Sequence, residues 1–132
     1  MKRIEHLGIA VKNLEEAIPM YEALLNTPCY KREGVASEGV MTAFFQIGES
    51  KIELLEASNE ASPIAKFLSK NGPGFHHVAF EVENMEAEIE RLQAAGFQLI
   101  DEIAKDGADN KRIAFLHPKS TNGLLVELCQ EK

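Results

Sequence analysis

The chain has 132 residues, of which 45% are hydrophobic and 27% are charged, and its formal net charge is -7 at pH 7. These values are typical of one globular domain and exclude an intrinsically disordered chain. The acidic charge argues against a nucleic-acid-binding protein, and no apolar run approaches the roughly 20 residues that span a bilayer.

The first residues, Met1-Lys2-Arg3, lead directly into a strand-like stretch, without the apolar segment of a signal peptide. The two cysteines, Cys29 and Cys129, stand far apart in the sequence. Reduced thiols explain two distant cysteines better than a disulfide framework does. We therefore expect a cytoplasmic protein.

One structural unit is predicted to occur twice along the chain. Residues 6–14 (HLGIAVKNL) and 77–85 (HVAFEVENM) share a pattern in which an alternating strand runs into a helix. Asn13 and Asn84 are typical N-caps, with acidic residues in the first turn after each. The expected helices cover residues 14–25 and about 85–95.

Each half is expected to continue with about three strands after its helix. The last of these strands contain residues 52–54 (IEL) in the first half and 126–128 (VEL) in the second, which match each other. Hairpin turns are expected at Gly48-Glu49 and at Asn122-Gly123.

The whole chain, residues 1–132, is expected to be a single domain. The first repeat unit covers about residues 1–58, a linker with a short helix covers about residues 59–73, and the second unit covers about residues 74–132. Two tandem βαβββ units predict an α+β fold with a mixed eight-stranded, cup-like sheet and with helices on its outer face.

Strand alternation predicts a cluster of metal ligands on one face of the sheet. Apolar side chains take one face of the first strand of each unit, while His6 and His77 share the other face with small residues. Glu53 and Glu127 stand in the middle of otherwise apolar strands, where a carboxylate is costly unless it is paired or binds a metal. The repeat would bring the four side chains together, as ligands suited to Co²⁺, Mn²⁺, Ni²⁺ or Zn²⁺.

Three segments resemble the metal-bearing strands of the vicinal oxygen chelate superfamily, which includes glyoxalase I, ring-cleaving dioxygenases and fosfomycin-resistance proteins. They are residues 6–11 (HLGIAV), 74–79 (GFHHVA) and 124–128 (LLVEL). Three further segments give a resemblance to the methylmalonyl-CoA epimerase family along nearly the whole chain. They are residues 52–56 (IELLE), 62–68 (SPIAKFL) and 112–120 (RIAFLHPKS).

The resemblance implies interconversion of (2R)- and (2S)-methylmalonyl-CoA, between propionyl-CoA and succinyl-CoA metabolism. It implies a divalent metal, foremost Co²⁺, bound by His6, Glu53, His77 and Glu127, with Glu53 replacing the Gln of some relatives. It further implies an acyl-CoA substrate as partner, no nucleic acid or membrane partner, and a homodimer with one site in each protomer.

The chemistry that the resemblance implies needs acid–base groups on both faces of the substrate. Chelation of the thioester carbonyl and the carboxylate would stabilise the thioester enolate that forms on loss of the C2 proton. Because the enolate is planar, inversion requires proton transfer on both sides. The resemblance assigns one side to Glu127. Thr42 stands where characterised relatives carry the second Glu, so Glu38 or a water molecule is an alternative there.

Four residues are candidate substrate contacts. Thr42 and Gln46 are expected on one face of their strand, and Lys119 and Ser120 lie in the turn before the strand of Glu127. The last two would bind the free carboxylate or part of CoA.

Three other functions are compatible with the same fold. A glyoxalase-like lyase acting on a thiol adduct would use the same four ligands, whereas a ring-cleaving dioxygenase would need Fe(II) with open positions. A non-catalytic small-molecule binding protein is favoured by Thr42 and disfavoured by the metal ligands, which sequestration does not require.

Overall fold

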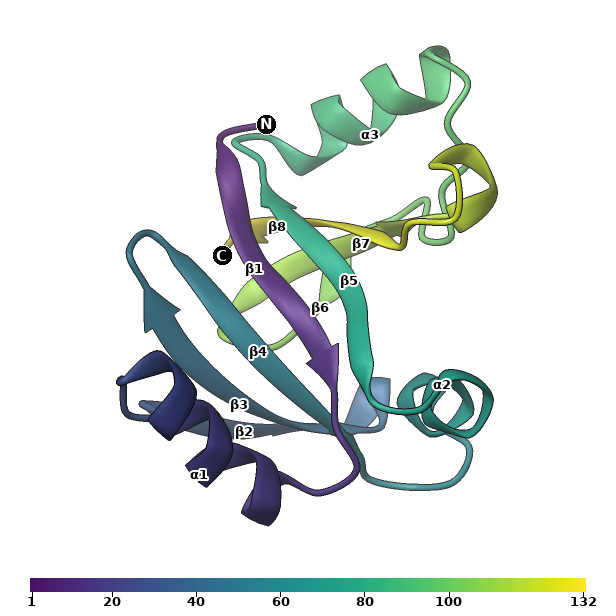
Figure 1. The fold of residues 1–132 in the computed structure, drawn as a ribbon. Helices are drawn as coiled ribbons and strands as arrows, with labels where there is room; N and C mark the ends of the chain where they lie inside the picture. The colour runs from purple at the N-terminus through teal and green to yellow at the C-terminus, as the bar shows by residue number, and fades with distance from the viewer. The chain divides into compact units, whose positions relative to one another are not determined.

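The computed structural model describes all residues from 1 to 132. It contains eight strands, three α-helices and two 3₁₀ turns (Figure 1). In chain order these are β1 (Arg3–Ala10), α1 (Leu14–Leu25), β2 (Lys31–Val35), η1 (Ala36–Glu38), β3 (Val40–Ile47), β4 (Ser50–Ala57), α2 (Pro63–Asn71), β5 (Gly74–Glu81), α3 (Met85–Ala94), β6 (Lys105–Asp106), β7 (Lys111–Leu116), η2 (Pro118–Ser120) and β8 (Val126–Glu131).

The strand order along the sheet is β2-β3-β4-β1-β5-β8-β7-β6. β5 and β8 run parallel, whereas the β2–β3, β3–β4, β6–β7 and β7–β8 pairs are antiparallel. The predicted mixed, eight-stranded α+β fold is therefore confirmed. None of the helices is long and apolar enough to cross a membrane.

The chain divides into two compact units, residues 7–76 and residues 1–6 with 77–132, so β1 and β5 each contribute to both. The boundaries that the sequence suggests for the two repeats, and the single domain that they form, remain predictions.

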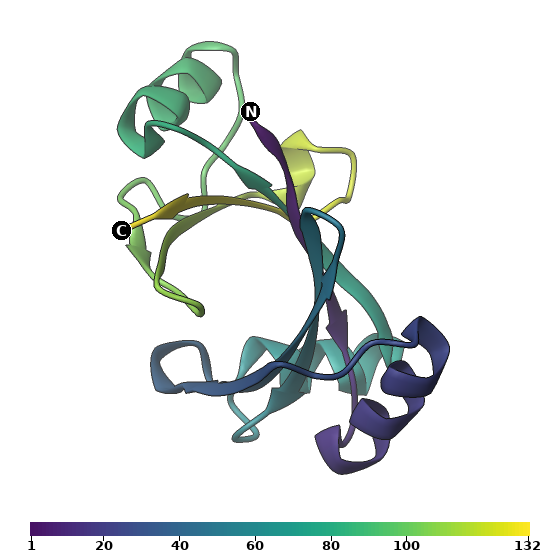
Figure 2. The same ribbon diagram turned by 90° about the vertical axis from the view of Figure 1, so that its left-hand side faces the viewer.

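In the unit of residues 7–76, α1 lies along one face of β2, β3 and β4 (Figures 1 and 2). The contact is an apolar core between the helix, the end of β1 and the alternate residues of β3 and β4. Its buried members are Val11, Leu14, Ala17, Ala43, Phe45 and Leu54. Gly48 and Glu49 form the predicted two-residue turn, because Ile47 pairs with Ser50.

The start of α1 is capped twice. Asn13 has extended backbone angles, and its side chain accepts a hydrogen bond from the Glu16 N–H at 3.2 Å. The carboxylate of Glu56, on β4, accepts the Leu14 N–H at 2.7 Å. Both acceptors satisfy N–H groups that have no partner inside the helix.

The predicted linker helix is α2. Ser62 caps it by accepting the Ala65 N–H at 3.0 Å, and Pro63 occupies the first helical position. The helix ends before Gly72, whose φ of 77° few other residues adopt.

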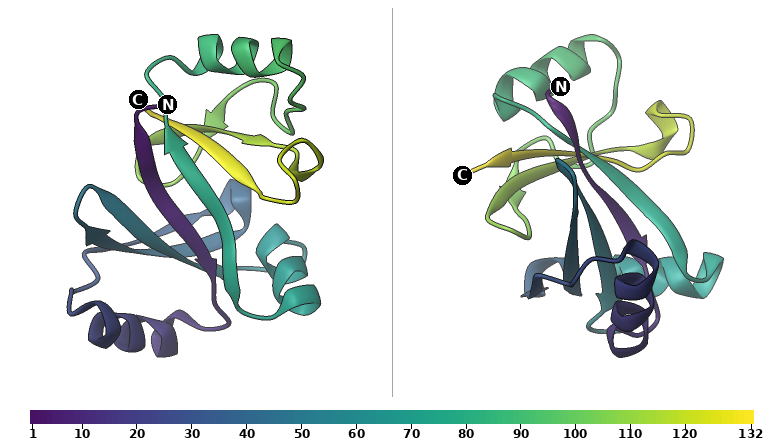
Figure 3. Two further views of the ribbon diagram at one scale, coloured as in Figure 1. Left: turned by 45° about the horizontal axis from the view of Figure 1, so that its top comes forward. Right: turned by 60° about the vertical axis from the view of Figure 1, so that its left-hand side comes forward.

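In the unit of residues 1–6 and 77–132, α3 packs against β8 and lies on one side of β8 and β7 (Figure 3). Its buried face consists of Met85, Ile89 and Leu92. Asn84 caps the helix by accepting the Ala87 N–H at 3.0 Å, as the sequence predicted. The helix ends at Ala94, one residue before the expected end.

The hairpin turn expected at Asn122-Gly123 joins β7 and β8, which pair antiparallel, and it is longer than the Gly48-Glu49 turn of the first half. β7 ends at Leu116 and β8 begins only at Val126, with η2 between them. Asn122 and Gly123 do have positive φ angles, of 59° and 93°, but inside a longer loop. The Gly123 N–H donates to the Pro118 carbonyl at 2.8 Å, so the loop closes on η2 and not on the strand ladder.

Candidate metal centre

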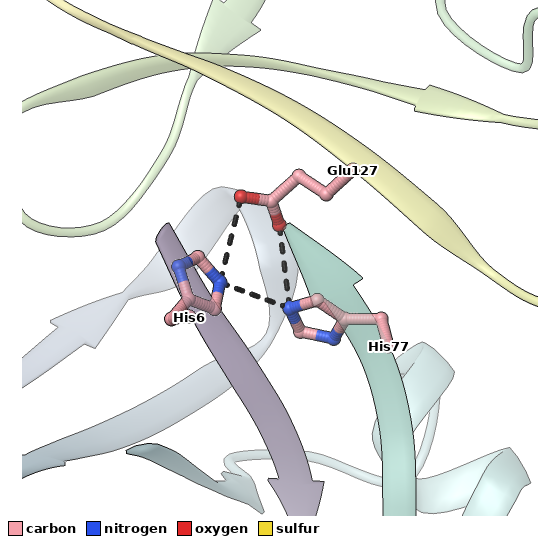
Figure 4. A group of neighbouring side chains, drawn as sticks. All are labelled: His6, His77 and Glu127. Carbon is pink, nitrogen blue, oxygen red and sulfur yellow. Dashed lines mark hydrogen bonds and ion pairs between the residues drawn. The ribbon is translucent and has the colours of Figure 1, made fainter. Parts of the chain in front are cut away.

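Three buried side chains, His6, His77 and Glu127, converge in the unit of residues 1–6 and 77–132 (Figure 4). The Nε2 atoms of the two histidines lie 3.1 Å apart. Oε2 of Glu127 lies 3.6 Å from Nε2 of His6, and Oε1 lies 3.4 Å from Nε2 of His77. One ligand atom from each of the three residues lies within 4.8 Å of the others.

Strand pairing explains why His77 and Glu127 meet. Ala79 on β5 is the register partner of Glu127 on β8, so their side chains share a face of the sheet. His77 lies two residues before Ala79 and therefore points the same way. The small Ala79 side chain, fully buried, leaves the carboxylate room to reach the imidazole.

A second carboxylate, that of Glu5, contacts the other ring nitrogen of His6, Nδ1. Oε1 of Glu5 lies 2.7 Å from Nδ1 of His6, and the Glu5 residue is only 2% exposed. An ionised carboxylate only accepts hydrogen bonds, so an ionised Glu5 would place the proton of His6 on Nδ1 and leave the lone pair on Nε2.

The ring of Phe115 forms one wall of the centre. It meets the His77 ring edge-on, with the centroids 5.9 Å apart and the planes at 83°. Phe115 is also the register partner of Glu127, and Nζ of Lys105 lies 5.6 Å above its ring. The neighbouring Cys129 thiol has its pKa raised by burial first and then by the charge of Glu127, so it stays protonated at neutral pH.

The donor set fits a divalent cation. An Nε2 lone pair, a second imidazole nitrogen and a carboxylate converge in a place shielded from solvent, where an uncompensated negative charge is costly. Imidazole nitrogen and carboxylate oxygen are ligands of Zn²⁺, Co²⁺, Ni²⁺ and Mn²⁺. This observation is consistent with the metal that the sequence predicted, without selecting one ion.

Glu53, the fourth predicted ligand, belongs to the unit of residues 7–76. It is 5% exposed and lies directly across from Phe44 in the β3–β4 pair. Burial lowers the pKa of His76 in the same unit, and the charge of Glu53 partly opposes that shift. The ring of His76 packs edge-on against Phe67 of α2, at 4.9 Å between centroids. Glu53 as a metal ligand stays a prediction.

Two of the four candidate substrate contacts lie on β3. Thr42 is fully buried, and its hydroxyl donates to the Glu33 carbonyl at 3.0 Å. Gln46 is exposed, and its amide donates to the carbonyls of Gly48 and Ser50 in the adjoining turn. Thr42 pairs with Leu55 of β4, and Gln46 pairs with Lys51. Leu55 and Lys51 alternate with the same period as Glu53, so Thr42 and Gln46 lie on the face of the sheet that carries the Glu53 side chain, as predicted.

The other two candidates lie on η2. Lys119 is exposed, and its backbone N–H donates to Nδ1 of His117. The Ser120 hydroxyl donates to the His117 carbonyl at 2.9 Å and accepts the Gln98 N–H at 3.2 Å. Ser120 thus ties the loop together, while the Lys119 ammonium group faces solvent. The substrate roles of all four residues stay predictions.

Two residues of the centre were missed by the sequence reasoning. Glu5 was not among the predicted residues, because alternation places it on the strand face opposite His6, and nothing in the sequence paired Phe115 with His77. The one available signal for Glu5 was its position directly before a candidate ligand. For Phe115 it was the strand register, which the sequence does not specify.

The chain is similar to known proteins over most of its length. A family model described as the Glyoxalase/Bleomycin resistance protein/Dioxygenase superfamily matches residues 5–115. The ethylmalonyl-CoA/methylmalonyl-CoA epimerase of Cereibacter sphaeroides is 42% identical over 130 residues, covering 97% of this chain and 97% of the relative. The mitochondrial methylmalonyl-CoA epimerase of Homo sapiens is 39% identical over 129 residues, covering 97% of this chain and 73% of the relative.

A solved structure is similar over the same length. It is a variant of the Streptomyces coelicolor methylmalonyl-CoA epimerase in complex with 2-nitronate-propionyl-CoA. The TM-score is 0.95 at 33% identity, and the match covers 99% of this chain and 95% of that one.

Proposed function

The chain belongs to the methylmalonyl-CoA epimerase family of the glyoxalase, bleomycin resistance and dioxygenase superfamily, and we propose that it interconverts (2R)- and (2S)-methylmalonyl-CoA. The observation that carries the proposal is the buried convergence of His6, His77 and Glu127. The similarity to epimerases over 97% of the chain supports the substrate.

The proposed metal ligands are His6, His77 and Glu127, with Glu53 as the fourth because its strand matches that of Glu127 in the repeat. Co²⁺ is the proposed ion, with Mn²⁺, Ni²⁺ or Zn²⁺ as alternatives. A bound dication would supply positive charge next to the oxygens on which the thioester enolate develops its negative charge.

Glu127 is the proposed acid–base for one face of C2. Its carboxylate reaches the centre with both oxygens and is buried, so it can take up a proton without competition from bulk water. Thr42 does not supply the opposite face, because its hydroxyl proton is donated to the Glu33 carbonyl and a hydroxyl is a poor base near neutral pH.

The proposed partner is the acyl-CoA substrate. Lys119 is proposed to contact an anionic group of it, since the residue is exposed, and Thr42, Gln46 and Ser120 remain proposed substrate contacts. We further propose a homodimer, on the family resemblance. A cytoplasmic location is supported by the free thiols of Cys29 and Cys129.

Isotope exchange in D₂O tests the reaction. Metal-free protein reloaded with Co²⁺ is incubated with one epimer of methylmalonyl-CoA. Deuterium at C2 is followed by NMR or mass spectrometry, and the other epimer by a coupled mutase assay. We expect exchange with inversion, lost in Glu127→Gln and His77→Ala. Glu131→Gln, an exposed carboxylate on the same strand, is the matched control and should keep the activity.

The outcomes separate the candidate functions. Exchange without inversion would mean that only the Glu127 face has a working base. No exchange by Co²⁺-loaded protein would refute the epimerase, and the same protein would then be assayed with the hemithioacetal of glutathione. Turnover there would establish a glyoxalase-like lyase, and inactivity in both assays would leave a binding protein.

A further inference from the structure

We infer that Glu5 is a positioning residue of the metal centre, which holds the His6 ring so that its Nε2 lone pair points at the ion. The inference rests on the metal binding proposed above. It adds a residue outside the four predicted ligands.

The contact between Glu5 and His6 is short and buried. Oε1 of Glu5 lies 2.7 Å from Nδ1 of His6, and the two side chains are 2% and 8% exposed. Taking a carboxylate out of water is expensive, and a charge-assisted hydrogen bond to an imidazole offsets part of that cost. The pair is therefore a well-defined arrangement and not a transient surface contact.

This hydrogen bond determines which nitrogen of His6 can bind a metal. With the proton on Nδ1, the lone pair is on Nε2, which lies 3.1 Å from Nε2 of His77 and 3.6 Å from Oε2 of Glu127. A carboxylate behind a metal-binding imidazole also orients the ring and makes it a stronger donor.

The two histidines of the centre are not equivalent in this respect. In the second repeat the position that corresponds to Glu5 is His76, directly before His77. The ring of His76 packs edge-on against Phe67 in the other unit. The residue before the ligand is thus a carboxylate in the first repeat and an aromatic packing residue in the second, so Glu5 has no carboxylate counterpart in the second repeat.

Metal affinity of the variants Glu5→Leu and Glu5→Gln tests the inference. Metal-free protein is titrated with Co²⁺ in competition with a chromophoric chelator, and the Co²⁺ absorption spectrum is recorded. Glu5→Leu is expected to weaken binding by about 10- to 100-fold, as loss of such an outer partner typically does. Glu5→Gln should lose less, because its amide oxygen still accepts the Nδ1 proton.

Glu81→Gln is the matched control. Glu81 is also a buried carboxylate of the same unit, but it pairs with Arg3 at 3.0 Å and Lys2 at 3.5 Å, not with a histidine. Its variant removes one buried negative charge and should keep the wild-type Co²⁺ affinity. If Glu5→Leu binds Co²⁺ as tightly as Glu81→Gln does, Glu5 has no positioning role.

Imidazole NMR gives a readout without metal or variants. Long-range ¹H–¹⁵N spectra of metal-free wild-type protein should show His6 protonated at Nδ1, and a proton on Nε2 would overturn the inference. This measurement also decides the matter should Glu5→Leu fail to fold. A wild-type protein that binds no Co²⁺ would refute the proposed metal centre itself. Equal Co²⁺ binding by wild type and Glu5→Leu would refute only the positioning role of Glu5.

Discussion

The imidazole rings of His6 and His77 meet edge to face at 86°, with their Nε2 atoms 3.1 Å apart. Because Glu5 leaves the lone pair of His6 on Nε2, the hydrogen bond between the rings needs a proton on Nε2 of His77. A metal ion would displace that proton, since both nitrogens must then offer lone pairs.

We therefore expect His77 to change tautomer on metal binding while His6 does not. In metal-free protein His77 should carry its proton on Nε2, and in Zn²⁺-loaded protein on Nδ1. Zn²⁺ is chosen because it is diamagnetic, and long-range ¹H–¹⁵N spectra report both states. Variants His6→Gln and His77→Gln assign the signals. Identical His77 spectra with and without Zn²⁺ would refute this centre as the binding site.

Replacing Glu56 should lower the free energy of unfolding, and the loss should be larger when the new side chain cannot accept the Leu14 N–H. Glu56→Leu removes the acceptor of the Leu14 N–H and should lower the free energy of unfolding by about 0.5–2 kcal/mol. Glu56→Gln keeps an acceptor and loses only the charge at the helix start, at a cost of about 0.3–1 kcal/mol. Urea denaturation measures both.

In the second repeat, the position that corresponds to Glu56 is occupied by the amide of Gln130. Gln130 accepts the Met85 N–H at 2.9 Å, so an amide already performs the capping role there. Equal stabilities of Glu56→Leu and Glu56→Gln would show that the hydrogen bond contributes nothing.

Gly39 should not tolerate a side chain, whereas Gly34 in the neighbouring strand should. A Cβ at Gly39 would lie 2.6 Å from Cβ of Ser62, and the φ angle of 66° is left-handed. Gly39→Ala should lower the free energy of unfolding by about 1–3 kcal/mol. At Gly34 the nearest atom is the flexible end of Met41 at 3.4 Å, so Gly34→Ala should stay within about 0.5 kcal/mol. Thermal melts that rank the two variants in the reverse order would contradict this account.

His76 should make the metal-free protein less stable in acid. Burial lowers the pKa of His76 below its ordinary value of 6.5, so the unfolded chain takes up a proton that the folded chain resists. The stability of the wild type relative to His76→Phe should therefore fall as the pH drops through 6.5 towards the folded pKa, and stay constant below it. Above neutral pH the difference should not vary.

Urea denaturation of metal-free wild type and His76→Phe across this range measures the difference. Phe keeps an aromatic ring against Phe67, and all other titrating groups are shared by the two proteins. A difference that is independent of pH between neutrality and mild acid would show that His76 does not titrate as described.

Local sequence signals predicted most of the elements and most of the candidate metal centre. Asn13 and Asn84 mark helix starts because a short polar side chain caps the free N–H groups, and both do so in the structure. Strand alternation and the repeat also identified His6, His77 and Glu127, since period-two geometry assigns a face to each residue without knowledge of the fold.

Only the tertiary structure decided which side chains touch. Alternation assigns Glu5 to the face opposite His6, yet its long side chain reaches the Nδ1 atom in the folded protein. The β7–β8 register sets Phe115 across from Glu127, and the fold engages the Thr42 hydroxyl with the Glu33 carbonyl. Two of these contacts join residues of different strands, and the third joins adjacent residues whose side chains start on opposite faces of one strand. All three depend on strand register and side-chain packing, which local sequence preferences do not specify.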